Sequence, residues 1–143
     1  MIYETNSSIE TEEIGKKLTQ NVKPGDVFCL KGDLGAGKTV FAKGFASGLG
    51  IKSEIPSPTF TILNEYHSGR LSLFHFDLYR LRDQNELFGI GYEEYFYGDG
   101  VTIIEWPEIA GSLVPQNATF ITFEADFNKN PCYRRITVEN TGT

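Results

Sequence analysis

The chain has 143 residues, enough for one domain with a normal core and short for two. Hydrophobic residues make up 40% and charged residues 22%, as in ordinary globular proteins. The 13 basic and 19 acidic residues give a net charge of −6. This charge argues against a stand-alone nucleic-acid binder, because neutralisation of phosphates dominates such binding. Any contact with nucleic acid is therefore expected to be made through a partner.

The chain carries no recognisable targeting signal, disulfide pattern or metal cluster. Its start lacks a basic region followed by an apolar run, and no apolar stretch reaches the roughly 18 residues of a membrane span. We therefore expect a cytoplasmic protein. Cys29 and Cys132 stand far apart without a neighbouring histidine, which predicts two reduced thiols. His67 and His75 likewise form no ligand cluster in the sequence.

The first half of the chain predicts a helix, a strand and a second helix. Ser7 and Ser8, followed by apolar residues four apart up to Val22, predict a capped amphipathic helix. After a turn, Val27–Leu30 is apolar throughout, as in a strand of a sheet that is covered on both faces. Apolar residues then recur at four-residue spacing from Phe41 and predict a helix that ends at Gly48–Gly50.

The second half of the chain predicts more strands than helices. Strands are expected at 60–66, 71–76, 101–104, 120–123 and 135–138, and a short helix at 83–88 that is interrupted at Gly89 and Gly91. The sequence thus predicts an α/β fold of the P-loop NTPase kind, in a single domain over residues 1–143. Its central sheet should be mostly parallel, made mixed by the hairpin at 60–77, and flanked by helices.

A phosphate-binding loop is the strongest chemical signal in the sequence. Residues Gly32–Thr39 match G-x-x-x-x-G-K-[ST] and lie between the apolar strand and the amphipathic helix, as this motif requires. Glycines let backbone N–H groups converge on phosphate oxygens, Lys38 supplies a positive charge, and the Thr39 hydroxyl can ligate Mg²⁺. The alternative is a structural turn. The expected nucleotide-binding residues here are Gly32, Gly35, Ala36, Gly37, Lys38, Thr39 and Val40.

Two acidic residues at strand ends could complete the site. Asp77 follows the strand at 71–76 and Glu105 follows the strand at 101–104, so both should lie at the carboxyl edge of the sheet, where open α/β folds bind ligands. A helix cap or turn residue is the alternative for each. Ser57-Pro58-Thr59 could sense a γ-phosphate or be an ordinary connection, and Trp106 is more typical of a core residue.

Two other nucleotide-dependent functions lack their usual residues. A guanine-specific GTPase would carry Asn-Lys-x-Asp, but the nearest segment, 128–131, has no Asp. Small-molecule kinases usually clamp a second phosphate with several arginines, and this chain has five, none of them in an arginine-rich lid. The sequence therefore favours ATP hydrolysis over phosphoryl transfer, with a small-molecule kinase and a nucleotide-dependent regulatory module as alternatives.

Four motifs in order resemble those of one family. Gly32–Thr39, Ser57–Thr61, His75–Leu81 and Ile104–Trp106 are similar to motifs of the bacterial TsaE (YjeE-type) ATPases of tRNA threonylcarbamoyladenosine biosynthesis. The resemblance implies ATP binding with Mg²⁺ and slow ATP hydrolysis. It also implies action together with TsaD-like and TsaB-like partner proteins, with tRNA, modified at adenosine 37, reached only through that complex.

The resemblance also implies roles for single residues. Thr39 and Glu105 would be the Mg²⁺ ligands, and Asp77 would orient water near the γ-phosphate. Lys38 would act on the phosphates, with Thr59 as the switch contact. The matching positions for contacts with the adenine and the outer phosphates are Ser8 or Thr11, and Arg134.

Overall fold

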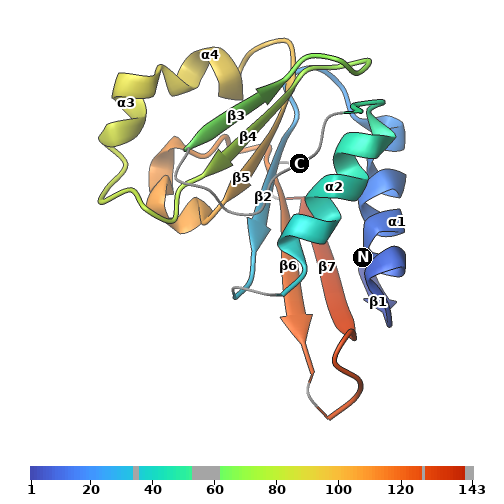
Figure 1. Ribbon diagram of the computed structural model, residues 1–143. Coiled ribbons are helices and arrows are strands. Elements are labelled where there is room, and N and C mark those ends of the chain that lie inside the picture. Colours follow the sequence, from blue (N-terminus) through green and yellow to red (C-terminus); the bar gives the residue numbers. More distant parts are fainter. Residues whose placement is uncertain (34–35, 53–61, 127, 141–143) are drawn as a thin grey trace.

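The computed structural model describes residues 1–33, 36–52, 62–126 and 128–140. In this part of the chain a seven-stranded sheet runs in the order β1-β7-β6-β2-β5-β4-β3, with helices on both faces (Figure 1). The strands are β1 (Ile2–Thr5), β2 (Val27–Lys31), β3 (Leu63–Tyr66), β4 (Leu73–Asp77), β5 (Val101–Glu105), β6 (Thr119–Ala125) and β7 (Arg134–Asn140). The α-helices are α1 (Ser8–Leu18), α2 (Lys38–Gly48), α3 (Glu86–Ile90) and α4 (Tyr92–Phe96), with 3₁₀ turns η1 (Thr19–Asn21), η2 (Pro107–Ile109) and η3 (Gly111–Leu113).

The centre of the sheet is parallel and its margins are antiparallel. Strand β2 pairs in parallel with both β5 and β6, and β5 pairs in parallel with β4. The pairs β3–β4, β6–β7 and β1–β7 are antiparallel. The predicted mixed α/β fold is thus confirmed, including the hairpin of β3 and β4. Because β2, β4 and β5 are parallel, their carboxyl ends meet at one edge of the sheet.

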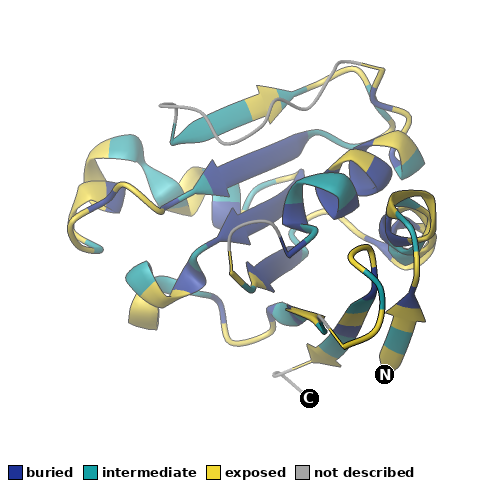
Figure 2. Ribbon diagram, turned by 60° about the horizontal axis from the view of Figure 1, so that its bottom comes forward, coloured by how far each residue is buried: buried dark blue, intermediate teal, exposed yellow. Residues whose placement is uncertain are grey.

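Apolar side chains on both faces of the central strands explain the continuous hydrophobic runs. On one face, Phe41 and Phe45 of α2 pack with residues such as Ile103 of β5. On the other face, Phe76 of β4 packs against Phe96 of α4, with ring centroids 5.2 Å apart. Figure 2 shows the central strands as the most deeply buried part of the fold. The edge of the sheet where the carboxyl ends of β2, β4 and β5 meet is therefore built on a rigid core.

Helices α1 and α2 lie side by side with glycines at their contact. A Cβ on Gly15 would lie 2.3 Å from the carbonyl oxygen of Phe41, and one on Gly44 would lie 1.9 Å from the carbonyl oxygen of Glu12. These distances leave no room for a side chain, so the two helix backbones touch directly. This contact fixes the start of α1 relative to the start of α2.

Several element boundaries differ from the sequence prediction. The first helix ends at Leu18 and continues as the 3₁₀ turn η1 before Val22. Helix α3 begins at Glu86 and passes through Gly89, so the predicted interruption there was wrong; the helix ends at Gly91, whose φ of 77° closes it. Strand β1 and helix α4 were not predicted, because four or five residues carry too little periodicity. Among the described helices, none has the length and apolar composition that crossing a membrane requires.

Candidate nucleotide-binding site

The turn between β2 and α2 depends on a glycine at its last position. Gly37 precedes α2 with φ of 105°, a left-handed conformation that residues with a Cβ rarely adopt. The chain can therefore enter the helix abruptly at Lys38. The first amides of α2 have no partners within the helix and carry the positive end of its dipole. This end of α2 opens onto a pocket.

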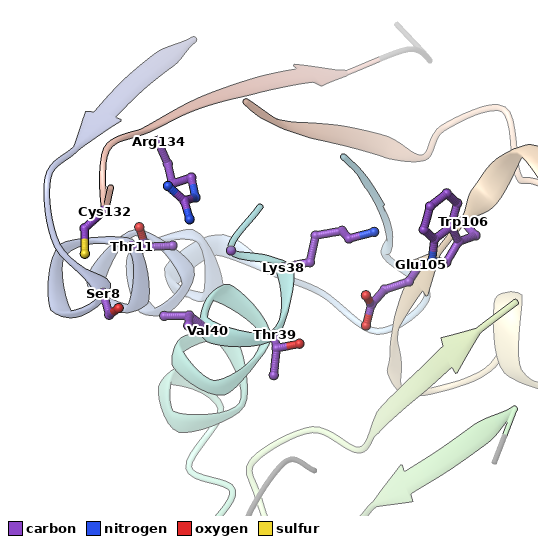
Figure 3. Close-up of a pocket in the computed structure, with 10 residues that line it drawn as sticks. Ser8, Thr11, Lys38, Thr39, Val40, Glu105, Trp106, Cys132 and Arg134 are labelled. Atoms are coloured by element: carbon purple, nitrogen blue, oxygen red, sulfur yellow. The ribbon is translucent and has the colours of Figure 1, made fainter. Parts of the chain in front are cut away.

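The pocket has a volume of about 190 Å³ and collects residues from α1, α2, β5 and β7 or their flanks (Figure 3). One end, here called the inner end, is formed by Lys38, Thr39, Glu105 and Trp106. The other, the outer end, is formed by Ser8, Thr11, Cys132 and Arg134. Gly37 and Val40 complete the lining. Eight of the residues expected from the sequence are thus brought together: Ser8, Thr11, Gly37, Lys38, Thr39, Val40, Glu105 and Arg134.

The ammonium group of Lys38 is held inside the protein. Its Nζ donates a hydrogen bond of 2.7 Å to the carbonyl oxygen of Gly32 and lies 4.2 Å from the ring centroid of Trp106. Lys38 is only 5% exposed. A carbonyl and an aromatic face are both favourable for a cation, so the ammonium group is kept at the inner end of the pocket.

The carboxylates of Asp77 and Glu105 sit at the ends of neighbouring strands. Asp77 of β4 pairs in register with Glu105 of β5. Glu105 is 4% exposed and lines the pocket, whereas Asp77 lies beside the lining. Burial raises the pKa of Asp77, and the negative charge of Glu105 raises it further, although the amide of Tyr79 donates a 3.1 Å hydrogen bond to its carboxylate. Each acid is therefore at the predicted sheet edge.

A histidine that the sequence did not suggest for the site contacts Glu105. His75 Nε2 lies 2.5 Å from Glu105 Oε2, and both side chains are buried. The pair joins residues 30 apart in the chain. Strand alternation does predict that His75 and Asp77 share a face, but only the pairing of β4 with β5 brings His75 to Glu105.

The outer end of the pocket is made by α1 and β7. Thr11 is buried, and its hydroxyl shares a 2.7 Å hydrogen bond with that of Thr5. Arg134 Nε donates a 3.0 Å hydrogen bond to the carbonyl oxygen of Ala36, which ties β7 to the phosphate loop. The guanidinium also donates to the carbonyl oxygens of Pro131 and Tyr133. Arg134 is thus fixed against the loop Gly32–Thr39; its expected contact with the nucleotide stays a prediction.

Two pocket residues were missed or assigned to another role. The sequence favoured Trp106 as a core residue. It is half-buried and packs against the core, but it also lines the pocket and has a left-handed backbone with φ of 61°. Strained backbones of this kind often mark functional sites, but nothing in the local sequence signals the conformation. Cys132 is exposed and lines the pocket; its position two residues before Arg134 was the available clue.

Some of the predicted site residues lie outside the part of the chain that the structure describes. Gly35 and the segment Ser57-Pro58-Thr59 lie outside the described residues, so their roles stay predictions. Gly32 and Ala36 are described but are not lining residues of the pocket. Their carbonyls accept hydrogen bonds from Lys38 and Arg134, which do line it.

The oxygen donors at the inner end suit Mg²⁺. Within the described ranges, no group of three or more His, Cys, Asp or Glu residues is arranged to hold a metal ion by itself. Mg²⁺ at nucleotide sites commonly takes one or two protein oxygens and completes its shell with phosphates and water. The Thr39 hydroxyl and the Glu105 carboxylate face each other across this end of the pocket (Figure 3), which fits such a shared site.

Comparison with known proteins identifies the family. Residues 5–136 match the family described as "Threonylcarbamoyl adenosine biosynthesis protein TsaE". The chain belongs to the TsaE family. It is 49% identical over 114 residues to the "tRNA threonylcarbamoyladenosine biosynthesis protein TsaE" of Bacillus subtilis, covering 80% of this chain and 71% of that protein.

Further comparisons extend this similarity over nearly the whole chain. The TsaE protein of Treponema pallidum is 44% identical over 134 residues, which are 94% of this chain and 96% of the relative. The crystal structure of Bacillus subtilis YdiB superposes with a TM-score of 0.80 at 40% identity, covering 99% of this chain and 86% of that one. The fold shared with this structure therefore extends through β1 and β7, and β7 supplies Arg134 to the pocket.

Proposed function

We propose that this TsaE-family protein binds and hydrolyses ATP with Mg²⁺ in the biosynthesis of tRNA threonylcarbamoyladenosine. The observation that carries the proposal is the meeting of Lys38, Thr39 and Glu105 at one end of a single pocket. A lysine, a hydroxyl and a carboxylate at the positive end of a helix are the groups that a Mg²⁺-triphosphate needs.

The inner end of the pocket would take the phosphates. Lys38 would exchange part of its contact with Gly32 for phosphate oxygens, which it can do because its side chain is long and rotatable. Thr39 and Glu105 would hold Mg²⁺, which, when bound, neutralises charge on the phosphate oxygens. Asp77, beside Glu105 on the next strand, would orient the attacking water. Thr59 is proposed as the contact that senses the γ-phosphate.

The outer end would take the base and sugar. Because the Thr11 hydroxyl is engaged with Thr5, Thr11 would meet the nucleotide mainly through its methyl group. Val40 and Cys132 add apolar or weakly polar surface, and Ser8 adds a hydroxyl. Arg134, fixed against the phosphate loop, brings a positive charge near the outer phosphates. Apart from Arg134, the side chains at this end are small and uncharged, which suits a flat base.

The partners proposed are TsaD-like and TsaB-like proteins, with tRNA reached only through their complex. The names of the relatives state a role in tRNA threonylcarbamoyladenosine biosynthesis. The net charge of −6 supports a protein that leaves tRNA binding to others. Residues 1–143 are proposed to act as one domain.

Measurement of ATP turnover tests the proposal. We expect slow release of phosphate by the protein alone and a different rate of release with the partner complex. Lys38→Ala should abolish phosphate release under both conditions. Phosphorylation of a small acceptor in proportion to ATP consumed would identify a kinase instead. Nucleotide-dependent partner binding without any turnover would identify a regulatory module.

A further inference from the structure

The buried pair of His75 and Glu105 has a geometry that does more than fill the core. His75 is 8% and Glu105 is 4% exposed, and the 2.5 Å contact joins Nε2 to Oε2. An ionised carboxylate can only accept hydrogen bonds. When Glu105 is ionised, as a metal ligand is, the His75 tautomer with hydrogen on Nε2 donates to it.

The strand register explains why the two side chains meet. In the parallel pair β4–β5, His75 lies opposite Ile103, and Asp77 lies opposite Glu105. Residues two apart on a strand point to the same face, so His75, Asp77 and Glu105 all face the side of the sheet that carries α2. The imidazole reaches forward along the strand direction to Glu105, which lies two residues beyond Ile103, the register partner of His75.

The hydrogen bond restricts how Glu105 can present its oxygens. Glutamate has several rotatable bonds, and a metal ligand that must be ordered on binding loses affinity through conformational entropy. His75 lies in β4 between the buried residues Phe74 and Phe76, so its own position is fixed by packing. Among the described residues, His75 is the hydrogen-bond partner of this carboxylate, at Oε2, which leaves Oε1 for a metal.

We propose that His75 is a positioning residue that holds the Glu105 carboxylate in the arrangement needed to ligate Mg²⁺. The proposal rests on the proposed function, in which Glu105 is a Mg²⁺ ligand. Residues that orient metal ligands in this way typically change metal affinity by about 10- to 100-fold when they are removed. The competing explanation is that His75 only neutralises a buried charge, in which case its loss would lower stability and leave metal dependence unchanged.

Two amide substitutions separate these explanations. In His75→Gln the amide nitrogen lies the same number of bonds from Cα as Nε2 does in histidine, so it can still donate to Glu105. His75→Asn carries the same amide on a side chain one bond shorter, which cannot reach. Both variants carry the same uncharged amide at the position, so they differ only in reach, and Glu105→Gln serves as the reference for loss of the metal ligand.

The measurement is the affinity for ATP by calorimetry, with saturating Mg²⁺ and with EDTA, together with the melting temperature of each variant. We expect His75→Asn to lose about 10-fold or more of the gain in affinity that Mg²⁺ provides, with unchanged affinity in EDTA, and His75→Gln to retain most of that gain. Folded His75→Asn with the full Mg²⁺ gain would overturn the positioning role. If Glu105→Gln also kept the full gain, the metal site of the proposed function would fail instead. If His75→Asn did not fold, loss of the gain in folded His75→Gln would also overturn the proposal.

Discussion

Asp77 and Glu105 are register partners at the carboxyl ends of β4 and β5. Their carboxylates share one edge of the sheet, yet only Glu105 lines the pocket. The negative charge of Glu105 contributes to the raised pKa of Asp77, after the larger effect of burial. The two acids thus influence each other, and the protonation of Asp77 is linked to folding.

Asp77→Asn should stabilise the fold more at neutral than at acidic pH. Because the folded-state pKa of Asp77 lies above its unfolded value, folding disfavours the charged form. As pH rises from the unfolded-state pKa of Asp77 through its higher folded-state pKa, the native protein therefore loses stability. The Asn variant has no carboxyl group at this position and does not lose stability in this way. We expect the gain in the free energy of unfolding to be larger at about pH 7 than at about pH 4 in urea titrations without Mg²⁺.

Asp99→Asn, which removes an exposed carboxylate before β5, is the matched control for the charge change. A stability difference between Asp77→Asn and the native protein that is constant with pH would contradict the prediction.

Lys38→Ala should weaken ATP binding by about 2 kcal/mol, or roughly thirtyfold in Kd, because a charged hydrogen bond to phosphate is lost. Although the sequence suggested no packing role, Lys38 is buried beside Gly32 and Trp106, so we also expect a lower melting temperature. Calorimetric titration with ATP and thermal denaturation measure the two effects. Lys43→Ala removes an exposed lysine from the same helix and should change neither. Native ATP affinity in folded Lys38→Ala would refute the phosphate site.

The two cysteines should differ in their reaction with iodoacetamide. Cys29 is fully buried, and burial raises its pKa to about 12, so it should not react in the native protein. Cys132 is exposed at the pocket and should react. Saturating MgATP should slow the alkylation of Cys132 several-fold, because the bound base or sugar would cover it.

Peptide mass spectrometry after timed alkylation measures both sites in one sample, with Cys29 as an internal control for unfolding. Lys38→Ala should lose the protection by ATP. Equal labelling of Cys132 with and without saturating MgATP would place the base elsewhere.

Gly44→Ala should destabilise the protein by about 2 kcal/mol, because the new Cβ would lie 1.9 Å from the carbonyl oxygen of Glu12 and force α1 away from α2. Gly89→Ala is the matched control. Gly89 is also helical, but a Cβ there meets nothing within 4 Å, so this variant should gain about 0.5 kcal/mol or more. Urea unfolding of both variants measures the difference. If Gly44→Ala were as stable as Gly89→Ala, the two helices would separate easily and the prediction would be wrong.

The sequence could predict what local pattern determines. The phosphate loop is contiguous, and the apolar run Val27–Leu30 before it identifies a buried central strand. Asp77 and Glu105 could be assigned to the sheet edge because each directly follows a segment predicted as a strand. These features need no knowledge of which strands are neighbours.

The remaining features depend on tertiary structure. The contact of His75 with Glu105 exists because β4 and β5 pair, although 30 residues separate them. The pocket position of Trp106 follows from a left-handed backbone, which its residue type disfavours. Cys132 reaches the pocket because β7 lies beside α1 and the phosphate loop. Such relationships cannot be read from spacing along one chain.

The direct contact of α1 with α2 fixes the distance between the pocket residues on α1 and those on α2. Ser8 and Thr11 belong to α1, and Thr39 and Val40 belong to α2. With backbones touching at Gly15 and Gly44, no side-chain rotation can change the distance between the two ends. A nucleotide anchored by its base at α1 would therefore extend a set distance past the start of α2. Whether it reaches Glu105 and Asp77 would then depend on how many phosphates it carries.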